Sequence, residues 1–266
     1  MASEVVTAFD RDTAARPLGD GRYRVRFDRG WWVVKGPNGG YLAALIARAI
    51  RAEVGDPERA LRSLTVHYLA APREGEGEVV VRVERSGRGL TTVSARLEQD
   101  GTTMALALAA LARDYPGATE YVDLAMPDVP PPEELDAIPE GAQPVPFSQN
   151  FESHPAIGGL PFSGGERAVT GGWIRLREPR PLDELAIVAI ADAWWPAPFS
   201  VVDRPMVAPT IDLTVHVRAP LPRDHDDVLV DVRSDVARDG FFEEDVRIFA
   251  RDGTLLAHAR QLALLF

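Results

Sequence analysis

The hydrophobic pattern of this chain occurs twice, with the same order of predicted elements in each copy. A short strand precedes an apolar helix, and four longer strands follow it. In the first copy the strands are predicted at residues 21–27, 64–69, 78–85, 90–99 and 103–111, with the helix at 39–51. In the second copy they are predicted at residues 172–177, 211–218, 228–234, 241–250 and 255–265, with the helix at 185–195. One helix beside a run of antiparallel strands predicts an α+β unit whose curled sheet buries the helix.

The repeat is also visible in the amino-acid letters. Residues 64–67 (Leu-Thr-Val-His) recur at 213–216, at an offset of 149 (213 − 64). The hairpin signal Asp100-Gly101 recurs as Asp252-Gly253, at an offset of 152 (252 − 100). A repeat of this length is close to the size of a small domain. We therefore expect two units of one fold that pack together as a pseudo-dimer.

Between the two copies lies a segment that is predicted to be a linker. Residues 116–146 contain eight prolines, and residues 114–166 contain ten acidic residues and no lysine or arginine. Such a composition disfavours strand ladders and a packed core. We predict a first unit at residues 1–113, a Pro-rich acidic linker and loop at 114–166, and a second unit at 167–266.

Asp192 is the first candidate for chemistry. It is the only polar residue in the apolar run 185–195, where a wrapped helix should be buried. Burial makes a carboxylate costly and raises its pKa toward that of a useful general base. The alternative is a place on a solvated side of the helix, or a cap for a neighbouring loop.

The last predicted strand holds a second candidate, Gln261. It lies on a face of small residues, while its counterpart in the first copy is Ala109, so only one copy carries an amide. A purely structural amide is the alternative. Thr210 and Asp212 begin the first repeated strand, and by alternation both should point away from its apolar face unless the strand bends there. For Asp212 a simple strand-entry role is favoured.

Asn38, Gly39 and Gly40 open the first helix. Paired glycines at a helix N-terminus leave N–H groups at the positive end of the dipole open to a carbonyl or a phosphate. The alternative is an ordinary N-cap, for which asparagine is a preferred residue.

Composition excludes several classes of function. The net charge of −11 argues against nucleic-acid binding. There is no cysteine and no metal-ligand spacing, so we expect neither disulfides nor a metal site. P-loop, GxGxxG and GxSxG motifs are absent, which predicts no cofactor and no serine nucleophile. The sequence has no apolar run of 18 residues and residues 1–10 do not resemble a secretory leader, so no membrane association and a cytoplasmic location are expected.

Residues 36–42, 191–196, 209–213 and 259–261 together resemble the type II acyl-CoA thioesterase family. The resemblance runs from about residue 27 to residue 266, apart from the linker, and it implies a double hotdog fold. It also implies hydrolysis of acyl-CoA by a water molecule that Asp192, Thr210 and Gln261 orient and activate. By the same resemblance there is no metal, no cofactor and no covalent intermediate, and the chain forms a homodimer or a higher homo-oligomer.

Five further residues are expected to contact the acyl-CoA substrate, namely Asn38, Gly39, Gly40, Trp194 and Trp195. The glycine amides, or their second-half equivalents, would polarise the thioester carbonyl, and the tryptophans would line an acyl pocket. Two other functions stay open: an enoyl-thioester hydratase or dehydratase of the same fold, and a non-catalytic acyl-CoA binding protein. Because the copies differ at Gln261 and Asp192, we expect one working site per chain, in the second half or at the seam between the halves.

Overall fold

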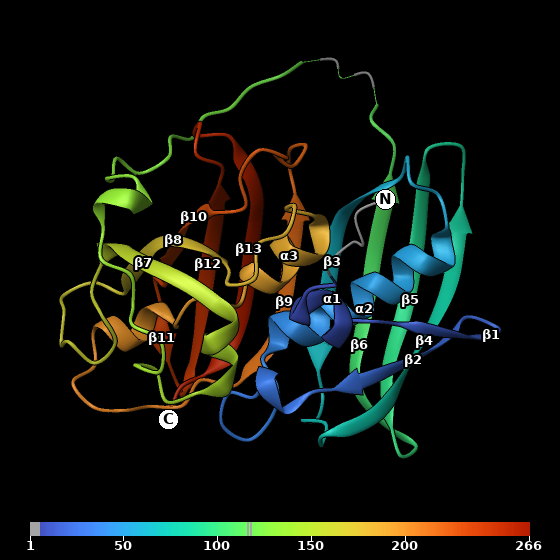
Figure 1. Cartoon of the computed structure of the whole chain (residues 1–266), viewed down its shortest axis with the longest axis horizontal. Coiled ribbons are helices and arrows are strands. Elements are labelled where there is room, and N and C mark those ends of the chain that lie inside the picture. The colour runs from blue at the N-terminus through green and yellow to red at the C-terminus, as the bar shows by residue number, and fades with distance from the viewer. Residues whose placement is uncertain (1–5, 116, 118) are drawn as a thin grey trace.

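The computed structural model describes residues 6–115, 117 and 119–266, and its strands form one continuous antiparallel sheet (Figure 1). The strand order is β1-β2-β4-β5-β6-β3-β9-β13-β12-β10-β8-β7, with β11 paired to β12. The first half contains α1 (Ala8–Asp12), β1 (Arg16–Gly19), β2 (Arg22–Phe27), η1 (Arg29–Trp31), α2 (Gly39–Val54), β3 (Ala60–Tyr68), β4 (Gly75–Ser86), β5 (Leu90–Gln99) and β6 (Thr102–Ala112).

The second half repeats this arrangement. After the short 3-10 turns η2 (Pro132–Glu134) and η3 (Pro146–Asn150) come β7 (Phe151–Gly158), β8 (Val169–Leu176), α3 (Glu184–Ile190), η4 (Ala197–Ser200), β9 (Thr210–Val217), β10 (Val228–Arg233), β11 (Ala237–Arg238), β12 (Phe241–Phe249) and β13 (Leu255–Leu264). The predicted double hotdog fold is confirmed, since each half of the sheet curls around its own helix (Figure 1).

The two halves meet where β3 pairs with β9. Thr65 lies directly opposite Thr214, and their hydroxyl oxygens are 2.9 Å apart. These threonines occupy the same position in the two copies, because their separation equals the repeat offset (214 − 65 = 149). A residue that faces its own counterpart marks a two-fold axis. The repeat is therefore built as a pseudo-dimer inside one chain, with its pseudo-two-fold axis between these side chains.

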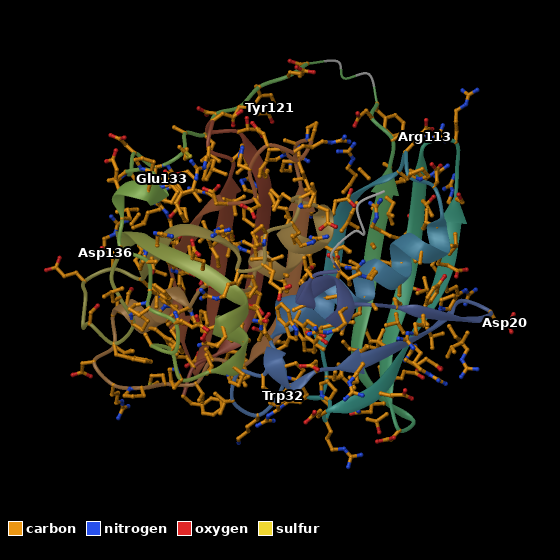
Figure 2. All side chains as sticks on the ribbon, viewed as in Figure 1. Asp20, Trp32, Arg113, Tyr121, Glu133 and Asp136 are labelled. Atoms are coloured by element: carbon orange, nitrogen blue, oxygen red, sulfur yellow. The ribbon has the colours of Figure 1, made fainter. Side chains whose placement is uncertain are left out.

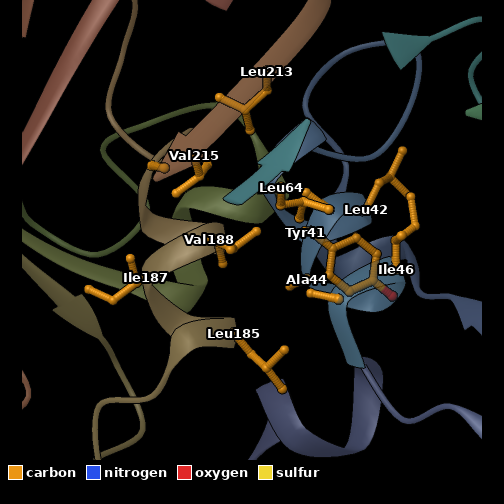
Figure 3. Packing of buried hydrophobic residues seen from close by; sticks show 14 of the residues in the cluster. Tyr41, Leu42, Ala44, Ile46, Leu64, Leu185, Ile187, Val188, Leu213 and Val215 are labelled. Atoms are coloured by element: carbon orange, nitrogen blue, oxygen red, sulfur yellow. The ribbon is translucent and has the colours of Figure 1, made fainter. Parts of the chain in front are cut away.

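Helices α2 and α3 lie on the concave face of the sheet and pack against each other. Figure 3 shows side chains of both helices meeting those of β3 and β9, including Ala44, Val188 and Leu64. The helices run antiparallel, because Gly40 near the start of α2 contacts Ala189 near the end of α3, while Arg51 near the end of α2 pairs with Glu184 at the start of α3. Each helix start thus lies beside the other helix's end.

The second helix is shorter than predicted. It was expected to span residues 185–195, but α3 ends at Ile190 and Asp192 lies in the turn that follows. The amides of Asp192 and Ala193 bond three residues back, to the carbonyls of Ala189 and Ile190, which tightens the chain out of the α-helix. Pro196 then prevents further helix.

A strand lies inside the segment that was predicted to be a linker. β7 pairs with β8 at the edge of the sheet, with an irregularity between Pro155 and Ile157. An edge strand tolerates proline, which has no N–H to donate. The expectation that residues 114–166 form only linker and loop is therefore wrong for residues 151–158. The outer limits at residues 113 and 167 stay predictions.

Residues 119–131 cross over the second half in the extended form that their prolines suggested. Tyr121 is highly exposed on this crossing (Figure 2), whereas Leu124, Met126 and Val129 pack on Trp173 and Phe249 of the outer sheet face. Residues 1–5 and Pro116, which entered the leader and linker predictions, lie outside the described residues. Within the described ranges, none of the helices combines the length and apolarity needed to cross a membrane.

Candidate active site at the seam between the halves

Asp192 lies in the turn after α3, against the start of α2 in the other half. Its Oδ2 accepts the Gly40 amide at 2.9 Å and the Asn38 side-chain Nδ2 at 3.0 Å. Asn38 Nδ2 also lies 2.7 Å from the backbone carbonyl of Asp192, while its Oδ1 caps α2 by accepting the Tyr41 amide. One asparagine therefore starts the helix of the first half and holds the carboxylate of the second.

The two glycines are needed because the halves approach closely here. A Cβ atom on Gly40 would lie 2.5 Å from the Ala189 carbonyl oxygen, and one on Gly39 would lie 2.9 Å from Asp192 Oδ2. Tyr68 fixes the other side of this helix start, since its hydroxyl donates to the Gly39 carbonyl at 2.7 Å. The expectation that the Gly40 amide faces a substrate carbonyl is not met in this structure, because Asp192 occupies that N–H group.

The environment of Asp192 sets its acidity. Burial raises the pKa of this carboxyl group to about 6, and hydrogen bonds from Gly40, Gly39, Asn38 and Gln261 oppose the rise. The positive end of the α2 dipole acts in the same direction as those hydrogen bonds. The result is a carboxylate that is ionised at neutral pH yet basic enough to accept a proton.

Gln261 on β13 and Thr210 on β9 complete the cluster. The Thr210 hydroxyl donates to Gln261 Oε1 at 3.0 Å, and the Gln261 side chain lies close enough to Asp192 to lower the pKa of that carboxyl group. The structure thus brings Asp192, Thr210 and Gln261 together, as expected. The amide is buried, with 4% of its surface exposed.

Thr210 reaches this face through a β-bulge. In the β9–β13 pair Asp212 faces Leu262 and Thr210 faces Ala263, so Ile211 is an extra residue. One extra residue reverses the alternation of every side chain before it. The bend that was needed for Thr210 to join the apolar face is therefore present. The first half has the same bulge between Leu61 and Ser63.

Glu244 on β12 belongs to the same cluster, although the sequence analysis did not select it. It is only 2% exposed and lies directly opposite Gln261. Its Oε1 accepts Gln261 Nε2 at 2.7 Å and its Oε2 accepts the Ala197 amide at 2.6 Å. Burial raises the pKa of Glu244 to about 8, and the nearby Asp192 charge adds to the rise. The alternation of side chains along the strand could have indicated that Glu244 is buried, because the residues that share its face are apolar, namely Phe242, Val246 and Ile248.

The symmetry-related place in the first half holds a different arrangement. Asp192 lies nine residues after the N-cap Asp183 (192 − 183), and the residue nine after the N-cap Asn38 is the buried Ala47 (47 − 38). There Glu184 pairs with Arg51 and accepts the Leu61 amide at 2.9 Å. A structural ion pair thus stands where the second half places its polar cluster.

Trp194 and Trp195 follow Asp192 and stack with ring centroids 4.4 Å apart. Trp194 is buried and its Nε1 donates to Thr170 at 3.0 Å. The Nε1 atom of Trp195 is buried without a hydrogen-bond partner among the described residues. A buried indole N–H normally has a partner, so this donor is available to a ligand.

A cavity of about 280 Å³ lies away from this cluster, on the outer face of the second half. Charged side chains that line the cavity form ion pairs with one another: Arg175 pairs with Glu152 at 3.0 Å, and Arg251 pairs with Asp227 at 2.8 Å. The carboxylate whose pKa is raised, Asp192, lies at the seam and not in this cavity.

Comparison with known proteins identifies the family. Residues 28–112 match the acyl-CoA thioesterase N-terminal domain and residues 126–265 match the acyl-CoA thioesterase C-terminal domain. The chain belongs to the acyl-CoA thioesterase family. Thioester hydrolysis is the activity of this family, so the chain is a thioester hydrolase. No curated protein sequence matches the chain.

Solved structures agree over the full length. A putative thioesterase II from Thermobifida fusca YX is 28% identical, with a TM-score of 0.85 and coverage of 99% of each chain. A conserved hotdog-fold protein of unknown function from Alicyclobacillus acidocaldarius is 27% identical, with a TM-score of 0.89 and coverage of 98% and 99%. An acyl-CoA thioesterase II from Mycobacterium marinum has the same fold at 20% identity, with a TM-score of 0.78 and coverage of 97% and 98%.

Proposed function

We propose that this family member hydrolyses acyl-CoA thioesters with a water molecule that Asp192 deprotonates and that Thr210 and Gln261 hold. The observation that carries the proposal is the convergence of these groups from three elements at the seam, where burial raises the pKa of Asp192 to about 6. A base with a pKa just below neutral is ionised and still accepts a proton from water.

The reaction needs four changes of bonding. Asp192 takes a proton from water as the water oxygen attacks the thioester carbonyl carbon, which gives a tetrahedral oxyanion. The oxyanion collapses, the C–S bond breaks, and the CoA thiolate takes the proton from Asp192. The products are the free acid and CoA. Asn38 and Gly40 hold Oδ2, and we assign the proton transfer to Oδ1.

The substrate contacts follow from the groups that stay unpaired. We propose that Trp194 and Trp195 line the acyl pocket, with the Trp195 N–H donating to a carbonyl oxygen of the substrate, because that buried donor lacks a partner. Asn38, Gly39 and Gly40 act in this proposal by orienting the Asp192 carboxylate.

The oxygen isotope in the product distinguishes water activation from direct attack by Asp192. In a single turnover with excess enzyme in ¹⁸O-water, we expect one ¹⁸O atom in the released acid and no change in the mass of the protein. Attack by Asp192 would form a mixed anhydride, and its opening by water at the Asp192 carbonyl would give unlabelled acid in the first turnover and leave ¹⁸O in the protein, which would refute the proposed mechanism. Opening at the acyl carbonyl would give labelled acid, so the protein is also quenched during the turnover and its mass is checked for an acyl adduct, which would refute the mechanism as well. A parallel incubation of the enzyme with the free acid corrects for oxygen exchange.

The pH profile provides a second test. Protonated Asp192 cannot accept a proton, so kcat/KM should rise about tenfold per pH unit below pH 6 and bend to a shallower slope above it, as the pKa of about 6 requires. Disappearance of the thioester absorbance measures this rate across the range. A profile that stays flat down to pH 5 would exclude Asp192 as the base.

The other candidate functions gain no support from the site. A hydratase was expected to use a histidine, and none of the described hydrogen bonds of Asp192, Thr210, Gln261 or Glu244 involves one. A binding protein without catalysis does not fit membership of a hydrolase family. Homo-oligomerisation and a cytoplasmic location stay predictions.

A further inference from the structure

Glu244 is costly to bury, and the proposed hydrolytic mechanism does not use it directly. A carboxyl group that is 2% exposed loses most of its hydration, and proteins seldom retain such a group without a specific use. Both of its oxygens accept short hydrogen bonds, at 2.6 Å from the Ala197 amide and at 2.7 Å from Gln261 Nε2. Its position is therefore fixed by one backbone donor and one side-chain donor.

The first half shows what this position holds where no site exists. Gln261 corresponds to Ala109, and the residue directly opposite Ala109 is Val93. The pair Glu244–Gln261 in one half is thus the apolar pair Val93–Ala109 in the other, at the same place in the same ladder. The sheet folds with the apolar pair, so its architecture does not require the buried acid. Glu244 accompanies Gln261 and Asp192, which links it to the site.

We propose that Glu244 is a positioning residue that fixes which way the Gln261 amide points, and thereby fixes the direction of the hydrogen bonds around the water molecule. The inference rests on the proposed function, since it assigns Gln261 and Thr210 to the water. Glu244 accepts from Gln261 Nε2 at 2.7 Å, so Oε1 must face Thr210. The Thr210 hydroxyl then donates to Oε1 and turns its lone pairs to the water.

Only an ionised carboxyl group satisfies both neighbours of residue 244 at once, so this role belongs to the carboxylate that Glu244 forms above its pKa of about 8. The Ala197 N–H belongs to the backbone and cannot turn, and the Gln261 N–H comes from the other side. A glutamine has one acceptor oxygen. In Glu244→Gln, the new NH₂ group must therefore face an N–H donor, either that of Ala197 or that of Gln261. The Gln261 amide is the group that can rotate. Its rotation brings its oxygen toward residue 244 and its NH₂ toward Thr210, so the Thr210 hydroxyl can no longer donate to it and its lone pairs are no longer left for the water molecule.

The diagnostic variant is therefore Glu244→Gln, which changes the size of the side chain very little. At pH 9, where Glu244 is ionised, we expect kcat for thiol release from acyl-CoA to fall at least tenfold while KM stays within twofold, because the substrate contacts are untouched. The matched control is Asp245→Asn. It breaks the adjacent cross-strand pair, Asp245 with Arg260, on the exposed outer face, and wild-type kcat is expected.

A double-mutant cycle separates positioning from a general structural role. If Glu244 acts through Gln261, Glu244→Gln should have no further effect on kcat in a Gln261→Ala background. Glu244→Val with Gln261→Ala rebuilds the Val93–Ala109 pair of the first half, so this double variant should fold even if Glu244→Gln does not. We expect it to have the kcat of Gln261→Ala alone, while its Tm reports the balance between removing a buried carboxyl group and leaving the buried Ala197 N–H without its acceptor.

Each outcome decides between the two claims. If the wild-type protein releases no thiol from acyl-CoA substrates, the proposed function fails and the role of Glu244 fails with it. If wild-type activity is present but Glu244→Gln keeps kcat within twofold, only the positioning role is overturned. A loss that persists in the Gln261→Ala background, or one that appears in KM, also overturns it.

Discussion

Replacing Asp192 with asparagine is expected to lower kcat for thioester hydrolysis by about 10²–10⁴. Asparagine retains an oxygen that can accept the Gly40 and Asn38 hydrogen bonds, but it cannot take a proton from water. The fold should not lose stability. The raised pKa of Asp192, about 6, means that the folded protein disfavours the charged form, so a neutral side chain removes a cost at pH 7. Steady-state thiol release and thermal melting measure the two effects.

Glu184→Gln is the matched control for this variant. Glu184 is an acid at the opposite end of the same helix pair, where it bonds Arg51 and the Leu61 amide. We expect the reverse pattern, a lower Tm with unchanged kcat. If Asp192→Asn retained kcat within threefold of wild type, or if Glu184→Gln lost activity without losing stability, the assignment of the site to one end of the helix pair would be wrong.

Gly40→Ala is expected to damage both stability and activity. The added methyl group would lie 2.5 Å from the Ala189 carbonyl oxygen and 3.0 Å from Asp192 Cβ. The first of these atoms belongs to the backbone, so α2 and α3 must move apart. Overpacking of this kind costs about 1–3 kcal/mol, which corresponds to a fall in Tm of roughly 2–10 °C. Because the movement also lengthens the hydrogen bond from the Gly40 amide to Asp192, we expect kcat to fall at least tenfold.

The comparison variant is Gly87→Ala, where the nearest atom to a new Cβ is the Leu90 carbonyl oxygen, at an ordinary contact distance of 3.5 Å. It should keep the Tm and kcat of the wild-type protein. An active and stable Gly40→Ala enzyme would show that the close approach of the helices is not what holds the base.

Much of the fold followed from periodicity alone. The predicted strands correspond to β2, β3, β4, β5, β6, β8, β9, β10, β12 and β13, with ends that differ by a few residues. Period-two alternation sets these strands locally, so it is visible in sequence. β7 was missed because Pro155 and the acidic composition around it disfavour a strand, and only pairing with β8 stabilises it there. The end of α3 was missed because the apolar run continues to Trp195, whereas the hydrogen bonds already tighten to three residues at Asp192 and Ala193.

The site was predictable to the extent that single residues broke a pattern. Asp192 interrupted an apolar run and Gln261 interrupted a row of alanines, so both could be selected. Thr210 could not be selected from its residues, since the bulge at Ile211 that turns it inward leaves no local signature. Its selection came from the family resemblance. Glu244 was not selected, because it stands between Glu243 and Asp245 and only the alternation of the strand separates it from these two acids.

The pairing of Thr65 with Thr214 shows that the chain contains two copies of one scaffold, related by a pseudo-two-fold axis. In most enzymes, substitutions that rigidify the surroundings of a site endanger its function. Here the symmetry-related end of the helix pair offers the same backbone environment without the chemistry. Stabilising substitutions tried around Arg51 and Glu184 can therefore rigidify one end of the helix pair while the residues that contact Asp192 stay unchanged, so stability and activity can be optimised at opposite ends of the same pair.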